Sequence, residues 1–164
     1  MTQTHSDAGM ADSITHALKG HAAAIALFML WRDVLHFWDD LVDQDQAISR
    51  RDIDLSMFKA LVAIPSNGFY RQFQDQLQPI LISAIANWQA ATEFEKTLDQ
   101  RKLEIAYVIR SDYANLLIHM AYLVGGYDWM VEVTPQIRAQ WSSEDFTEYL
   151  ANLAAEIVAR DTTL

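Results

Sequence analysis

The chain has 164 residues, of which 51% are hydrophobic and 21% charged, and this length and composition suit one compact domain with a buried core. Twelve Lys and Arg residues against 22 Asp and Glu residues give a net charge of −10, which opposes binding to nucleic acids and to anionic membrane surfaces. The lack of cysteine in the sequence excludes disulfides, thiolate metal sites and cysteine nucleophiles.

Apolar residues at helical spacing begin near the N-terminus. A long helix is predicted from Ile14 to about Gln44, with a bend at Gly20, because its apolar residues recur every three or four positions. Polar residues then indicate a connector over 45–54.

Prolines and glycines divide the rest of the chain into further helices. Pro65 is expected to end one helix, Pro79 suits the first turn of another, and Gly125 with Gly126 supplies a C-terminal cap. Pro135 indicates a less regular stretch over 127–141. The helices expected on these grounds span 55–64, 69–77, 79–94, 103–123, and a last segment capped by Ser142 or Ser143 that runs to about Arg160.

No segment shows a convincing β pattern, so the predicted fold class is all-α. We expect a single-domain antiparallel helical bundle of about five to seven helices, with a flexible N-terminal tail over 1–12 and the helical domain over 13–164. The first residues lack the basic flank and apolar run of a secretory signal, and Gly20 to Trp31 is too short to cross a bilayer. These observations predict a cytoplasmic protein that binds neither membranes nor nucleic acids.

One dense acidic cluster stands near the end of the first predicted helix. Asp39 and Asp40 lie four and three positions before Asp43, and either spacing brings two side chains to within about 5–6 Å at Cβ on a helix. His36 lies on the same helix face as Asp40 and Asp43. Carboxylate oxygens in this arrangement suit Mg²⁺, which keeps several waters and bridges to phosphates. The cluster therefore predicts a magnesium site at Asp39, Asp40 and Asp43.

The segment Asp39-Asp40-Leu41-Val42-Asp43 resembles the first aspartate-rich motif of class I isoprenoid synthases, especially the squalene and phytoene synthases. The resemblance implies an all-helical fold in which Asp39 or Asp40, together with Asp43, holds Mg²⁺ ions that clamp a substrate diphosphate. The second metal-binding motif of that family has no good match here, since the segment Asp112–Asn115 lacks the later acidic residue.

A second resemblance extends over more of the chain. The features that carry it are the segments Trp38–Asp45, Asn67–Tyr70, Ala106–Arg110 and Leu123–Gly126. Their order resembles a family of uncharacterised all-helical proteins encoded by bacteriophages and prophages. That family brings no established activity, so the resemblance implies a phage or prophage origin and leaves the chemistry open.

Polar residues elsewhere are candidates to line a site beside the acidic cluster. Asp112, Asn115 and His119 follow one another at i, i+3 and i+7, on one face of a predicted helix, and His36 adds a possible acid or base. His119 on an apolar stretch is more typical of a core histidine than of a ligand.

Arg110 is a further candidate for the site, because it stands in the middle of an apolar helix. If it is buried it must pair with a carboxylate, and Asp40, Asp43 or Asp112 are the expected partners. Such an ion pair would explain the acidic cluster without any metal.

Two functions remain open at this point. We slightly favour a non-catalytic acidic helical module that binds another protein or a second copy of itself, because no complete catalytic constellation is present. The alternative is an Mg²⁺-dependent, diphosphate-binding, enzyme-like protein that uses the helix carrying Asp39, Asp40 and Asp43.

Overall fold

A computed structural model describes residues 3–43, 47–97, 99–141 and 145–162, and within these ranges it contains helices and no strand. The chain therefore has the predicted all-α, single-domain fold. The helices in chain order are α1 (Gln3–Ala17), α2 (Ala22–Asp43), α3 (Arg50–Phe58), the π-helical turn η1 (Lys59–Ala63), α4 (Ile64–Ser66), α5 (Gly68–Glu95), α6 (Gln100–Arg110), α7 (Ala114–Trp141) and α8 (Phe146–Thr162).

The long helix predicted from Ile14 onward is two helices. The chain turns between α1 and α2, where Lys19 and Gly20 have positive φ values of 51° and 68°. This left-handed backbone ends α1, and the amide of Gly20 donates to the carbonyl of Thr15 at 2.8 Å. The range 1–12, expected to be a flexible tail, is helical from Gln3 onward.

Two prolines expected to separate helices lie inside helical segments instead. Pro65 stands in the first turn of α4, directly after the wide turn η1, where a missing amide proton costs little. Asn67 then ends that segment and caps α5, because its Oδ1 accepts from the amides of Phe69 and Tyr70 at 2.9 and 3.1 Å. From there α5 continues through Pro79, so the two helices expected at 69–77 and 79–94 are one.

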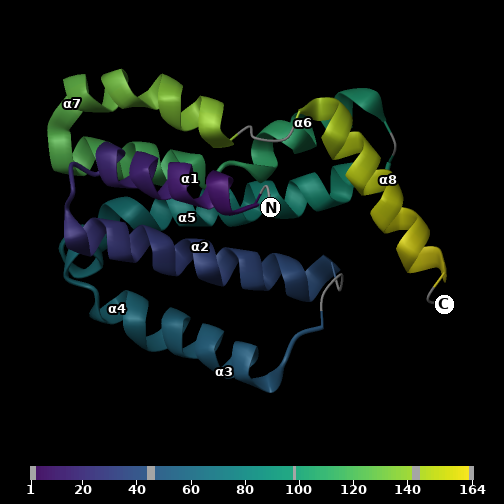
Figure 1. Ribbon diagram of the computed structural model, residues 1–164, viewed down its shortest axis with the longest axis horizontal. Helices are drawn as coiled ribbons and strands as arrows, with labels where there is room; N and C mark the ends of the chain where they lie inside the picture. The colour runs from purple at the N-terminus through teal and green to yellow at the C-terminus, as the bar shows by residue number, and fades with distance from the viewer. Residues whose placement is uncertain (1–2, 44–46, 98, 142–144, 163–164) are drawn as a thin grey trace.

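The predicted break at Gly125 and Gly126 is present inside α7. Gly126 has φ 80° and ψ −173°, a backbone conformation open to glycine alone, and the two halves of α7 run back along one another from it (Figure 1). The second half is helical through Pro135, although a less regular stretch was expected there. The expected cap at Ser142 or Ser143 lies outside the described residues.

The core lies between α1, α2, α5 and α7. Its largest fully buried side chains are Ile14, Leu18, Leu27, Phe28, Leu77, Leu116, Leu117, Met120 and Ile137. The segment from α3 to α4 forms an outer layer along α2, at the bottom of the view, while α6 and α8 lie together at its right (Figure 1). None of the helices in the described part of the chain combines the length and the apolarity that a bilayer span requires.

Candidate functional site

Two carboxylates at the acidic end of α2 line two different cavities. Asp39 lines a cleft shared with α5 and the end of α6. Asp40 lines a groove between α2 and α3. Consecutive residues on an α-helix project about 100° apart, which accounts for the separation. His36 lines both cavities.

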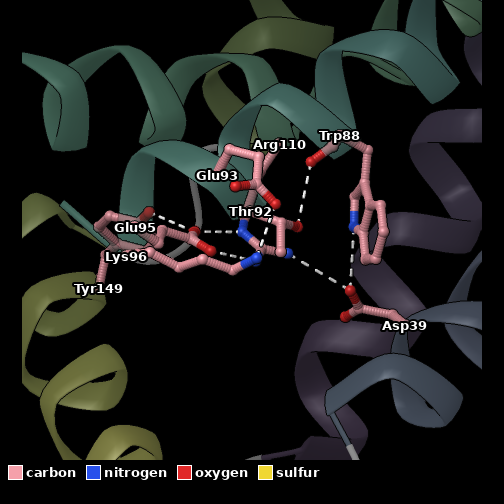
Figure 2. A network of polar contacts seen from close by, with 8 residues as sticks. All are labelled: Asp39, Trp88, Thr92, Glu93, Glu95, Lys96, Arg110 and Tyr149. Carbon is pink, nitrogen blue, oxygen red and sulfur yellow. Dashed lines mark hydrogen bonds and ion pairs between the residues drawn. The ribbon is translucent and has the colours of Figure 1, made fainter.

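Arg110 is the centre of the polar network beside Asp39 (Figure 2). Its Nε and Nη2 donate to the two carboxylate oxygens of Glu95, and its Nη1 lies 3.4 Å from Asp39 Oδ1. The indole Nε1 of Trp88 donates to the same Asp39 oxygen at 3.0 Å. Arg110 is therefore paired with carboxylates, as expected, but these partners are Glu95 and Asp39, neither of which was among the expected ones; the side chain of Asp43 lies outside the described residues.

Glu95 is the most deeply buried acid of this network, with 6% of its surface exposed. Besides Arg110, it accepts a hydrogen bond from the hydroxyl of Tyr149 on α8 at 2.5 Å. Burial first, and then this hydrogen bond, raise the pKa of Tyr149 above its ordinary range, so the hydroxyl remains a donor. A buried carboxylate needs donors on both oxygens, and α6 and α8 supply them.

An apolar cleft of about 140 Å³ adjoins the network. Trp38 and Trp88 pack against each other in its wall, with ring centroids 4.2 Å apart. The guanidinium of Arg110 lies 5.6 Å from the Trp88 ring centroid, within the range of a cation–π contact. The other lining residues are Leu35, His36, Asp39, Ala84 and Tyr113.

The groove that contains Asp40 is larger, at about 430 Å³, and more polar. Lys59 of η1 reaches into it and pairs with Asp33 of α2, with 2.6 Å between Nζ and Oδ2. Asp52 of α3 also lines this groove, and hydrogen bonds from the hydroxyl and amide of Ser49 lower the pKa of its carboxyl.

Asp39 and Asp40 do not converge on one position where they could share a metal ion. Asp39 is already engaged by a guanidinium and an indole N–H, and Asp40 opens into the other cavity. Across the described part of the chain, no group of three His, Asp or Glu side chains is placed to hold a metal. The side chain of Asp43 lies outside that part, so the magnesium site stays a prediction.

The row of Asp112, Asn115 and His119 lines neither cavity. Asp112 accepts from Asn87 at 2.7 Å and from Asn115, and Asn115 in turn accepts from Arg138. His119 has a buried Nε2 with no hydrogen-bond partner among the described residues, and burial lowers its pKa. This row links α5 to α7 and is separate from the Arg110 network.

Sequence reasoning did not identify Glu95, Trp88 and Tyr149 as members of the network. Glu95 carried a usable signal: with Ala84, Trp88 and Ala91 it continues the inward face of α5 at steps of four, three and four. A carboxylate in phase with a buried stripe predicts a buried partner. Tyr149 is 54 positions from Glu95 in the sequence, and no spacing pattern linked the two residues.

Compared with known proteins, the chain matches no family model, no curated protein and no solved structure.

Proposed function

We propose that this protein is an interaction module that binds a basic amphipathic helix of another protein through its outer layer. The observation that carries the proposal is an apolar surface on α3 and η1, which we call the outer face. Its members lie at helical spacing and are all exposed: Ile53, Met57, Phe58, Leu61 and Val62.

The outer face is the side of the helix that points away from the rest of the molecule. The inner side packs on α2, where Ser56 is buried and Ala60 and Ala63 are half-buried. Phe58 and Leu61 expose 56% and 66% of their surfaces. Large apolar side chains gathered in this way on a small protein are typical of a binding surface.

Charge favours a basic partner over a second copy of the chain. The groove between α2 and this helix contains three carboxylates, Asp33, Asp40 and Asp52, and one ammonium, Lys59, so its formal charge is −3 + 1 = −2 with His36 neutral. The whole chain carries −10, which repels an identical chain. A partner helix with an apolar stripe and flanking Lys or Arg residues complements both features.

Binding of a synthetic helical peptide tests the proposal. Its Leu residues form one stripe and its Lys residues flank that stripe, and fluorescence anisotropy measures its affinity. We expect Phe58→Asp and Leu61→Asp each to weaken binding by about tenfold or more, because a carboxylate would have to be buried against the Leu stripe. A peptide with Glu in place of Lys should bind far more weakly.

Ile82→Asp is the matched control, because Ile82 is exposed to 67%, almost the same as Leu61, but lies on α5. Equal binding by Leu61→Asp and Ile82→Asp would contradict the proposal. Light scattering of the chain alone tests the alternative that a second copy of the chain covers the outer face. A wild-type dimer that Leu61→Asp makes monomeric would support that alternative and contradict the proposal.

A further inference from the structure

The aromatic cleft beside Arg110 has the dimensions of a small binding site. Its volume of about 140 Å³ is close to that of a protein cavity of about 150 Å³ that holds a single benzene ring. Trp38, Trp88 and Tyr113 provide aromatic surface, and Leu35 and Ala84 complete an apolar wall. The cleft therefore suits a ligand with one ring or an apolar group of similar size.

Asp39 offers a hydrogen-bond acceptor to such a ligand. Both of its contacts, from Trp88 and from Arg110, are made to Oδ1. In the part of the chain that the structure describes, Oδ2 receives no hydrogen bond or ion pair. The side chain is 45% exposed and lines the cleft, so a ligand donor can reach this oxygen.

The charges of the network favour a cationic ligand. Asp39 and Glu95 contribute two carboxylates and Arg110 one guanidinium, which gives a formal charge of −2 + 1 = −1. Glu95 takes the Nε–Nη2 edge of the guanidinium, so the positive charge in the cleft wall is already matched by a carboxylate. An anion in the cleft would be repelled by the net negative charge of these three groups. A cation would be attracted both by that charge and by the faces of the aromatic rings.

We propose that the cleft binds a small organic cation in which an ammonium or related group donates to Asp39 Oδ2 while a ring or comparable apolar group packs against Trp38 and Trp88. This site is separate from the outer face, and neither proposal depends on the other.

Three ligands of nearly equal shape test the proposal on the wild-type protein: benzylammonium, neutral benzyl alcohol and anionic benzoate. The indole N–H resonance of Trp88, which reports on the hydrogen bond to Asp39, is followed during each titration. We expect benzylammonium to bind with a dissociation constant on the order of 1 mM, benzyl alcohol about tenfold more weakly, and benzoate not at all. Equal affinity for the ammonium and the alcohol, or no shift with any ligand, would overturn the proposal.

Substitutions locate the binding. Asp39→Asn keeps an acceptor for Trp88 and removes the charge, so its affinity for benzylammonium should fall about tenfold, to that of the alcohol. Ala84→Leu fills the cleft and should abolish binding of both ligands. Asp54→Asn, which removes an exposed charge on α3, is the control and should bind as the wild type does. Undiminished binding by Asp39→Asn would refute the assigned site, and if that variant does not fold, Ala84→Leu and the ligand series decide.

Discussion

The guanidinium of Arg110 and the carboxylate of Glu95 form a two-pronged ion pair that joins α6 to α5. Only 7% of the Glu95 side chain and 22% of the Arg110 side chain are exposed. The pair sits at the junction of four helices, because Asp39 extends it to α2 and Tyr149 extends it to α8. Its removal should therefore loosen the end of the bundle that carries α8.

Replacing Arg110 by Ala should lower the free energy of unfolding by about 3 kcal/mol, because Glu95 would remain buried without its main partner. Urea denaturation followed by circular dichroism measures the loss. The double variant Arg110→Leu/Glu95→Leu is the control: it removes both charges and should recover most of that stability. A double variant less stable than Arg110→Ala would contradict this account.

Tyr149→Phe should reduce stability by about 1–2 kcal/mol near pH 8, since it deletes a hydrogen bond to a buried carboxylate. The raised pKa of Tyr149 adds a pH dependence. Above its ordinary value of 10.0 the unfolded chain loses the phenolic proton while the folded chain keeps it, so the contribution of Tyr149 declines as the pH rises. Urea titrations between pH 8 and about pH 11 should show the two proteins converging. A constant difference across that range would be the opposite result.

His119 should make the protein less stable in mild acid. Burial lowers its pKa from the ordinary 6.5, so just below that pH His119 binds a proton in the unfolded chain but stays neutral in the folded chain. The contribution of neutral His119 to the free energy of unfolding is fully present above pH 6.5. It is lost as the pH falls toward the lowered pKa of the folded chain. His119→Leu removes this dependence, and thermal melts at pH 7 and pH 5.5 should show a smaller drop for the variant. The imidazole resonances of His119 provide an independent check by nuclear magnetic resonance.

Gly125→Ala should destabilise the turn in α7, because the added Cβ would collide with the side chain of Trp129. Trp129 cannot easily move: its indole donates to the carbonyl of Ala17 at 2.9 Å and so ties α7 to α1. We expect a loss of about 1–3 kcal/mol. Gly68→Ala is the control, since a Cβ at Gly68 meets no atom within 4 Å, and it should leave stability unchanged or slightly higher. Similar effects from both substitutions would refute the collision.

The fold class could be predicted from helical periodicity, whereas the boundaries of several helices could not. Pro65 was expected to end one helix and Pro79 to begin another, but each expectation rests on a local preference that the surrounding structure overrides. The wide turn η1 precedes Pro65, and packing of α5 on its neighbours outweighs the missing hydrogen bond at Pro79. The bend predicted at Gly20 is a complete break between α1 and α2, and the positive φ of the neighbouring Lys19 had little sequence signal because lysine rarely adopts that conformation.

The candidate site was predicted in part. The sequence identified Asp39 and Arg110 as notable, but helix spacing alone cannot tell which acid faces a given arginine across the bundle. Asp39 and Asp40 are adjacent in the chain and open into different cavities, which depends on how α2 packs between α3 and α5. Glu95 has charged residues close to it in the sequence, so its position on the buried face of α5 was not recognised.

The wide turn η1 also determines which side of α3 meets the solvent. A π-helical turn contains one residue more than the α-helical turn that would replace it. Deleting one residue within Lys59–Ala63 would rotate α3 by about 100° relative to α4, which is enough to bring a different set of side chains to the surface. Loss of a single codon there would thus turn part of the apolar exterior of this helix toward its neighbours and bring side chains from its flank to the surface, while leaving every other residue of the chain in place.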